Sequence, residues 1–211
     1  MIELSNPNQN ITAIVLAAGS SSRLGKPKQL LHYQEETLIK QVIKTASAIS
    51  KNKVIVVTGF LHQELDQELK AFPVMLVHNP DWEQGMGSSI RTGIKALQNL
   101  ENSNQINAAL FLLSDQPLIT TAYLDQLIAQ FYLHKNSMIA ATSYAGTHGV
   151  PAVFDKSFFP ELEQLSGKSG AQKIFKNHLQ ELITLPFEDA AIDIDTEEDY
   201  QNLINSIKKT K

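Results

Sequence analysis

The sequence contains no cysteine, and this absence excludes several kinds of site at once. Disulfide bonds, thiolate zinc sites, iron–sulfur clusters and cysteine nucleophiles all require a sulfur ligand or nucleophile that the chain does not have. Any metal ion that the protein binds must therefore be held by oxygen or imidazole ligands.

Long apolar runs and an excess of positive charge are also missing. No apolar run approaches the ~20 residues that a membrane-spanning helix needs. The chain has 18 Lys and Arg against 22 Asp and Glu, a formal net charge of −4. This balance argues against a nucleic-acid or membrane partner, although a local basic patch could hold a small phosphorylated ligand. Residues 1–10 are polar and carry Glu3, so no signal peptide is expected, and we predict a cytoplasmic protein.

The pattern of hydrophobic residues predicts one α/β domain over residues 1–211, with an ordered part of about 11–207. Short apolar runs rich in β-branched residues indicate strands that are buried on both faces. Amphipathic stretches between them indicate helices, so we expect a three-layer α/β/α fold with a mainly parallel central sheet. Residues 144–170 are less regular and suggest an antiparallel insertion or a lid-like region. The expected strands are 11–16, 54–58, 74–77, 108–113 and 138–142, the expected helices 38–48, 63–71, 88–97, 122–134 and 197–207, and a disordered tail would follow.

The loop after the first strand, residues 17–28, combines small residues with positive charge. Small side chains let backbone amides approach a ligand, and Gly19 and Gly25 permit positive φ angles. Such a loop suits a polyphosphate when cations follow it, and here there are three: Arg23, Lys26 and Lys28.

This loop differs from the two common phosphate-binding motifs. The spacing between glycine and lysine is one residue too long for a Walker A motif, and Pro27 stands where a magnesium-binding Ser or Thr would be. Ser21 occupies the second glycine position of a dinucleotide-binding motif. We therefore expect phosphates to be held by backbone amides and by Arg23 and Lys28. The alternative, a solvated turn with incidental cations, is less favoured because the loop follows directly after a buried strand.

A second loop with functional character follows the third predicted strand. Its segment Gly87-Ser88-Ser89 is small enough for a base or a ribose to approach the backbone closely. Ser88 is also the expected N-cap of the helix that follows a tight glycine turn. A capped helix without a ligand remains the alternative interpretation.

Aspartates follow the strand end at 108–113 and precede the last predicted helix. Asp115 stands before Pro117 and could hold Mg²⁺, or it could form an Asx turn that starts the next helix. Asp193 and Asp195 lie two residues apart in an extended segment, so their charges favour a cation between or beside them. The segment from Thr196 to Asp199 also fits a capping box, and both roles can coexist.

Taken together, these motifs resemble the nucleotidyltransferases with a nucleotide-diphospho-sugar transferase fold. The pattern Leu16-Ala17-Ala18-Gly19-x-Ser21-x-Arg23-x-Gly25-x-x-Lys28 is similar to the signature of that superfamily. Lys28-Gln29-Leu30-Leu31 and Gly85-Met86-Gly87-Ser88-Ser89 resemble the molybdenum cofactor cytidylyltransferase branch. The resemblance covers residues 11 to about 203, and its motifs occur in the family's order.

The resemblance implies a role for each motif. Arg23 and Lys28 would neutralise the phosphates of a nucleotide triphosphate, and Mg²⁺ would bind Asp115 and Asp195, with Asp193 as the alternative to Asp195. Lys28, Arg23 and Asp115 are thereby the expected catalytic residues. The nucleotide would be contacted by Leu16, Ala17, Ala18, Gly19, Ser20, Ser21, Arg23, Lys28, Gly87, Ser88 and Ser89.

The implied reaction transfers a nucleotidyl group, from CTP in the favoured case, to a phosphorylated acceptor such as molybdopterin cofactor, with release of pyrophosphate. A molybdoenzyme or its maturation factor would be a further partner. Gln172 stands where related enzymes have arginine, and this departure leaves the acceptor open. Two alternatives are a sugar- or polyol-phosphate nucleotidylyltransferase and a non-catalytic nucleotide- or cofactor-binding chaperone for molybdoenzyme maturation.

Overall fold

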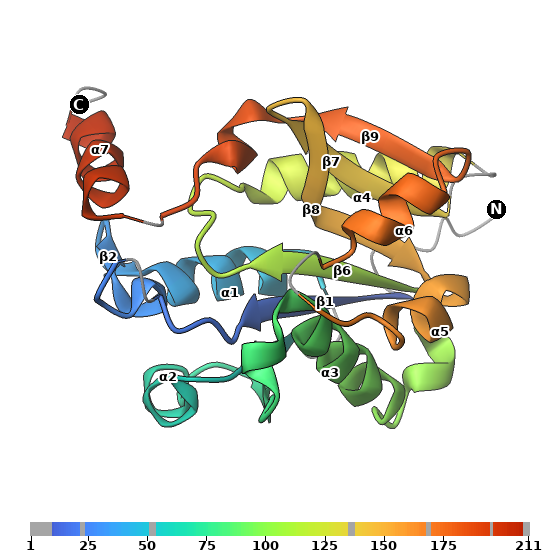
Figure 1. Ribbon diagram of the computed structural model, residues 1–211, viewed down its shortest axis with the longest axis horizontal. Coiled ribbons are helices and arrows are strands. Elements are labelled where there is room, and N and C mark those ends of the chain that lie inside the picture. The colour runs from blue at the N-terminus through green and yellow to red at the C-terminus, as the bar shows by residue number, and fades with distance from the viewer. Residues whose placement is uncertain are drawn as a thin grey trace, which may run out of the picture.

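A seven-stranded sheet forms the centre of the protein, in the order β5-β4-β1-β6-β8-β7-β9 (Figure 1). The five predicted strands are confirmed as β1 (Ile11–Ala17), β4 (Val54–Thr58), β5 (Val74–His78), β6 (Ala108–Leu113) and β7 (Ile139–Tyr144). Every residue of β1 is buried, as the unbroken apolar run predicts. The computed structural model describes residues 10–21, 24–50, 54–134, 138–167, 170–194 and 196–208.

Helices cover both faces of this sheet and confirm the three-layer α/β/α architecture. One apolar core joins the sheet to α1 (Leu38–Ile49), α2 (His62–Glu68) and α4 (Thr121–Leu133). The opposite core joins it to α3 (Met86–Gln98), α5 (Phe159–Leu162) and α6 (Gln172–Asn177). Short 3-10 helices connect the larger elements: η2 (Lys28–Leu30), η3 (Trp82–Gln84), η4 (Ser103–Gln105), η5 (Lys156–Phe158) and η6 (Glu188–Ala191).

The predicted antiparallel insertion is β8 (Thr147–Asp155), which pairs antiparallel with both β6 and β7. A tight turn at Ala145 and Gly146, both with positive φ, connects it to β7. The strand β9 (Leu182–Pro186), which the sequence did not suggest, then pairs parallel with β7 at the edge of the sheet. The antiparallel alternative is thereby confirmed for residues 147–155, which form an internal strand of the sheet.

A third, smaller apolar cluster lies beyond the sheet. Here Tyr33, in the hairpin of β2 (His32–Tyr33) and β3 (Glu36–Thr37), is buried with Leu24 and with Leu203 of α7 (Glu197–Lys208). The predicted capping box starts α7, because the backbone N–H of Asp199 donates to Thr196 Oγ1 at 3.1 Å and Thr196 N–H donates back to the Asp199 carboxylate at 2.8 Å. The segment that leads to α7 is thus held at the same end of the sheet as the loop after β1 (Figure 1).

The strand order places a topological switch between β1 and β6. Both strands are parallel neighbours, but the chain leaves β1 toward β4 and β5 and returns to β6 through α3. In open α/β sheets the crevice at the carboxyl ends of such strands is where ligands bind. Within the described ranges, the structure contains no helix with the length and apolar character that crossing a membrane requires.

Candidate nucleotide site

A pocket of about 560 Å³ opens at this switch point. It is bounded by the loop after β1, the start of α3, the end of β6 and the segment before α7. Its lining combines backbone and small side chains with one cation and several carboxylates, a composition that suits a phosphorylated ligand. The lining residues are Leu16, Ala18, Gly19, Ser20, Lys28, Gln29, Trp82, Glu83, Gly85, Met86, Ser89, Leu113, Ser114, Asp115 and Asp193.

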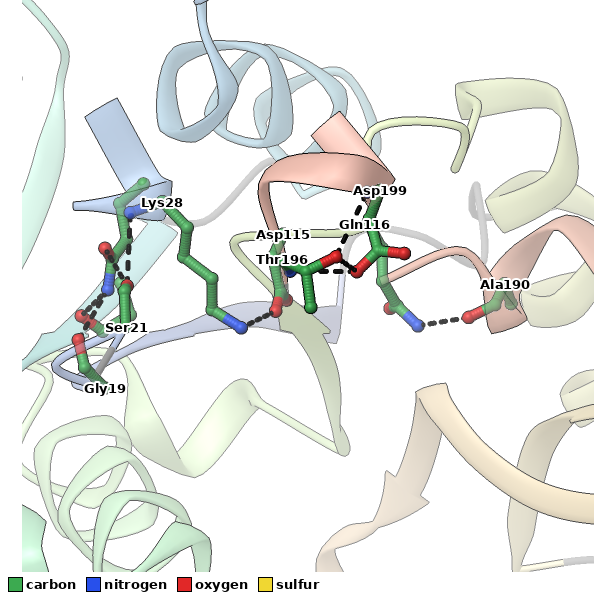
Figure 2. A network of polar contacts seen from close by, with 10 residues as sticks. Gly19, Ser21, Lys28, Asp115, Gln116, Ala190, Thr196 and Asp199 are labelled. Atoms are coloured by element: carbon green, nitrogen blue, oxygen red, sulfur yellow. Dashed lines mark hydrogen bonds and ion pairs between the residues drawn. The ribbon is translucent and has the colours of Figure 1, made fainter. Parts of the chain in front are cut away.

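An ion pair between Lys28 and Asp115 forms part of the pocket lining (Figure 2). Lys28 follows the loop after β1 and Asp115 follows β6, so the pair joins the two strands of the switch point. The side chains are only 17% and 9% exposed, respectively. Removing either partner would therefore take away a counter-charge from a largely buried group, which is costly. The sequence placed both residues in one site, and the structure brings them into direct contact.

Gln29 is a site residue that the sequence analysis did not single out. It is 1% exposed, and its side-chain amide donates to the carbonyl oxygens of Gly19 at 2.8 Å and Ala17 at 3.3 Å. Ser21 Oγ donates to Gln29 Oε1 at 3.3 Å and accepts from the backbone N–H of Lys28 at 3.1 Å. The only sequence signal for this role was its position beside Lys28 in the family-like motif.

The start of α3 differs from its prediction. We expected Ser88 to be the N-cap, but the helix begins at Met86 and Gly85 is the cap residue, with a φ of 102°. The prediction was wrong because the glycine turn ends, and the helix is capped, three residues earlier than Ser88. Ser88 is fully buried, accepts from Asn79 Nδ2 at 2.9 Å and lies within 2.8 Å of the Gly85 carbonyl oxygen.

Ser89, in contrast, lines the pocket. Its hydroxyl oxygen accepts from the same Asn79 amide at 3.1 Å. Because the oxygen is used as an acceptor, the hydroxyl proton of Ser89 is available to donate to a ligand. Asn79 thereby orients both serines from a buried position.

The segment after α5 packs tightly against this part of the pocket. The backbone N–H of Gly87 donates to the Gly167 carbonyl at 3.0 Å. A Cβ atom at Gly87 would lie 2.9 Å from backbone atoms of Ser166, so a larger residue cannot fit without movement. Gly87 therefore serves close packing between the segment after α5 and α3, and it is not among the residues that line the pocket.

Carboxylates other than Asp115 also surround the site. Asp193, the alternative metal ligand, lines the pocket and is exposed. Asp195, the favoured metal ligand, lies outside the described residues. Burial raises the pKa of the Tyr144 hydroxyl, and the charges of Asp193 and Asp115 raise that pKa further. Tyr144 thus lies within the electrostatic reach of both carboxylates and remains a neutral phenol at physiological pH.

The structure brings most of the predicted nucleotide contacts to one pocket. Its lining includes Leu16, Ala18, Gly19, Ser20, Lys28 and Ser89, and also Asp115, which was predicted as a metal ligand. Four other predicted contacts lie outside the lining and instead pack against it or hydrogen-bond to residues near it: Ala17, Ser21, Gly87 and Ser88. Arg23 lies outside the described residues, so its predicted role stays a prediction. Among the described residues there is no cluster of three or more His, Asp or Glu that could hold a metal ion by itself.

Comparison with known proteins places these features in a family. A family model described as MobA-like NTP transferase domain matches residues 13–182 of this chain. The match runs from β1, through the pocket loops and Asp115, to the start of β9. It therefore includes the signature loop and the ion pair, while α7 lies beyond it.

Two curated relatives match nearly the whole chain. Nicotine blue oxidoreductase of Paenarthrobacter nicotinovorans is 29% identical over 205 residues, covering 92% of this chain and 96% of the relative. The purine catabolism protein PucB of Bacillus subtilis (strain 168) is 29% identical over 200 residues, covering 90% and 94%. Molybdenum cofactor cytidylyltransferase of Escherichia coli (strain K12) is 34% identical over 89 residues, which cover 42% of this chain and 46% of the relative.

Solved structures share the same fold along almost their whole length. Rv0371c from Mycobacterium tuberculosis H37Rv superimposes with a TM-score of 0.80 at 27% identity, covering 93% of this chain and 98% of that protein. The same protein in complex with manganese gives a TM-score of 0.76 at 25% identity, with coverages of 94% and 100%. These likenesses confirm the nucleotide-diphospho-sugar transferase fold that the sequence predicted.

Proposed function

Because the chain belongs to the MobA-like NTP transferase family, we propose that it transfers a nucleotidyl group from CTP to a phosphorylated acceptor and releases pyrophosphate. The acceptor that we propose is a molybdopterin-type cofactor. In this reaction a phosphate oxygen of the acceptor forms a bond to the α-phosphorus of CTP. The bond from that phosphorus to the β-phosphate oxygen breaks, and pyrophosphate leaves.

The Lys28–Asp115 pair is the observation that carries this proposal. It places a cation and a carboxylate in contact in the lining of a pocket that small loop residues surround. Lys28 would bind the phosphates that leave, because their negative charge increases as the bond breaks. The proposal also assigns phosphate binding to Arg23, in the same loop. No covalent intermediate with the protein is needed, because a phosphate acceptor is already ionised at neutral pH.

The residues at the site also suit a divalent metal ion. We propose that Mg²⁺ binds Asp115 together with Asp195, with Asp193 as the alternative ligand. Mg²⁺ takes few protein ligands and completes its shell with phosphate oxygens and water, which fits a site with isolated carboxylates. When bound, the ion would neutralise negative charge on the phosphates. The manganese complex of Rv0371c supports a hard, oxygen-ligated cation in a protein of this fold.

Two observations support CTP as the nucleotide and molybdopterin cofactor as the acceptor. The segment from Gly85 to Ser89 resembles the cytidylyltransferase branch, and Ser89 offers a hydroxyl proton to the pocket. Over 89 residues the chain is 34% identical to a molybdenum cofactor cytidylyltransferase. A partner that receives the product, either a molybdoenzyme or its maturation factor, is part of the same proposal.

Family membership alone does not determine the reaction, since one relative along nearly the whole chain is named an oxidoreductase. The two alternatives that the sequence left open are a sugar- or polyol-phosphate acceptor and a non-catalytic chaperone. The contact between Lys28 and Asp115 favours catalysis over simple binding, because it assembles a phosphate-binding cation and a metal-ligand carboxylate at one point.

The test is a matrix of the four common NTPs and three acceptor classes. Molybdopterin cofactor, sugar phosphates and polyol phosphates would each be combined with Mg²⁺, and pyrophosphate release and product mass would be measured. We expect release with CTP and molybdopterin cofactor, and a product whose mass exceeds that of the acceptor by one cytidylyl group, that is, by CMP less one water. Release with a sugar phosphate only would select the first alternative. Nucleotide binding without release in any combination would select the chaperone.

A further inference from the structure

Two buried glutamines beside the pocket make nearly the same hydrogen bonds but hold different parts of the site. Gln29 donates to the carbonyl oxygens of Gly19 at 2.8 Å and Ala17 at 3.3 Å. Gln116 donates to the carbonyl oxygens of Ala190 at 2.8 Å and Val150 at 3.3 Å. Their exposed fractions are 1% and 2%. Gln29 binds the end of β1 and the loop after it, whereas Gln116 binds β8 and η6.

The bonds of Gln29 close the loop at its base. Residues 19 and 21 enter the loop and residues 28 and 29 leave it, and side-chain bonds connect the two sides (Figure 2). We refer to Gly19, Ser21, Lys28 and Gln29 as the loop neck. Ser21 has a φ of 56°, which a residue other than glycine adopts only when its surroundings hold it there. Its hydroxyl bonds to Gln29 and to the Lys28 backbone supply that restraint.

The neck also determines which backbone groups face the pocket. The carbonyl oxygens of Ala17 and Gly19 are turned toward the buried Gln29 amide. A carbonyl that pointed into the pocket would repel a phosphate, so its capture by Gln29 removes an unfavourable group from the lining. Gln29 is also the neighbour of Lys28 in η2, so the same bonds fix the start of the side chain that reaches Asp115.

We propose that Gln29 is a positioning residue that holds the loop neck in the shape that binds a polyphosphate. It acts through the carbonyls of Ala17 and Gly19 and through Ser21, and it need not touch the ligand. The ligand class is the triphosphate of a nucleotide, and in this respect the inference rests on the proposed function. Its consequence is that nucleotide affinity depends on an amide that lies below the pocket surface.

The test compares Gln29→Met with Gln116→Met. Methionine has a similar length and no charge, so each variant removes the two bonds that the amide nitrogen donates without adding electrostatic repulsion. Gln29→Met also removes the bond that Gln29 Oε1 accepts from Ser21 Oγ. The probe is inorganic tripolyphosphate, which has no base and needs no acceptor, measured by calorimetry alongside thermal unfolding. We expect both variants to lose stability to a similar degree, and only Gln29→Met to weaken tripolyphosphate binding, by about tenfold or more.

Ser21→Ala provides a second variant, in case Gln29→Met does not fold. Ser21 is half-buried, and its substitution breaks the link between Gln29 and the Lys28 backbone while leaving the amide bonds to Ala17 and Gly19. We expect an intermediate loss of tripolyphosphate affinity, of about threefold to tenfold. In the transfer reaction, either neck variant should raise the KM for CTP and leave the KM for the acceptor unchanged.

Equal tripolyphosphate affinity in wild type and both neck variants would overturn the inference, as would an equal loss in Gln116→Met. These results are independent of the reaction. If tripolyphosphate binding follows the expected pattern but no pyrophosphate is released with any acceptor, the proposed transfer fails while the positioning role of Gln29 stands. If transfer occurs but the neck variants bind normally, only the inference about Gln29 fails.

Discussion

The Lys28 ammonium is ion-paired with the Asp115 carboxylate across the point where β1 and β6 lie side by side. Both side chains are largely buried. In the proposed reaction Lys28 binds the phosphates, whereas Asp115 binds the metal ion. Each must therefore exchange its protein partner for a ligand when metal and nucleotide bind. This exchange makes the two binding events interdependent, and it leads to the first two predictions.

Lys28→Met should separate metal binding from catalysis. Without the ammonium, Asp115 loses the cation that it contacts, so we expect Mn²⁺ to bind the nucleotide-free protein about tenfold more tightly. Pyrophosphate release should fall by about 10²- to 10³-fold, because the charge on the leaving phosphates is no longer stabilised. Paramagnetic resonance of free Mn²⁺ measures the first effect, and a pyrophosphate assay measures the second.

The control for Lys28→Met is Lys26→Met. Lys26 is in the same loop but forms an exposed pair with Glu197 at 2.9 Å. Exposed pairs of this kind contribute only about 0–1 kcal/mol, so neither Mn²⁺ affinity nor pyrophosphate release should change much. Unaltered Mn²⁺ affinity in Lys28→Met would show that the ion pair does not compete with metal binding.

Asp115→Asn should have the opposite effect on metal binding. The change removes the carboxylate charge, so Mn²⁺ affinity should fall by about tenfold or more and the Mg²⁺ dependence of pyrophosphate release should change sharply. The negative charge beside Lys28 is reduced, so tripolyphosphate should bind at least as tightly as in wild type without metal. Asp66→Asn, at an exposed position of α2, is the matched control. A normal metal response in Asp115→Asn would remove this residue from the metal site.

Gly19→Ala should test how closely the ligand approaches the loop. Gly19 lines the pocket, and a Cβ atom there would meet no protein atom within 4 Å. We therefore expect unchanged or slightly higher stability, by up to about 1 kcal/mol, since alanine restricts the unfolded chain. Nucleotide affinity should nevertheless fall, because the methyl group occupies space that the ligand needs.

Gly87→Ala is the informative contrast to Gly19→Ala. Its Cβ would lie 2.9 Å from the Ser166 backbone, so thermal stability should decrease before any ligand is added. Thermal unfolding and calorimetry with CTP would be measured on both variants. Full CTP affinity in Gly19→Ala would mean that the nucleotide does not approach this part of the loop.

Alkaline pH should destabilise the protein through Tyr123. Burial raises the pKa of this phenol from 10.0 to about 12, so the folded state favours the neutral form. The corresponding stability is fully present below pH about 10 and is lost as the pH rises through about 12. In Tyr123→Phe, urea unfolding should show a weaker dependence on pH in this range. The comparison isolates Tyr123, since the pKa values of Tyr132 and Tyr144 are also raised. Parallel curves for both proteins would contradict the assignment.

The sheet and the position of the pocket could be predicted because the relevant strands are short, apolar and buried on both faces. Apolar runs of this kind are typical of central parallel strands. In this architecture, ligand sites lie just beyond the carboxyl ends of the strands. Lys28 and Asp115 could be assigned to one site on this basis. Their direct contact could not, because it depends on the conformation of two loops that bring distant positions together.

Other features could not be predicted because their sequence signals are weak. β9 is a half-exposed edge strand of five residues that ends in Pro186, so it lacks both a continuous apolar run and a clear alternation. The helix α3 starts earlier than predicted because Gly85, which adopts a positive φ, caps it in place of Ser88. Gln29 looks like an ordinary polar residue until the fold places the loop carbonyls around it.

The packing of α7 has a consequence for the order in which parts of the protein can fold during synthesis. Leu24, in the loop after β1, is buried together with Leu203 of α7 and Leu38 of α1. During synthesis, every strand of the sheet leaves the ribosome before α7 does, so the sheet can assemble while Leu24 still lacks part of its apolar cover. The loop after β1 is thus translated long before its support, which is completed only when residue 203 has been added.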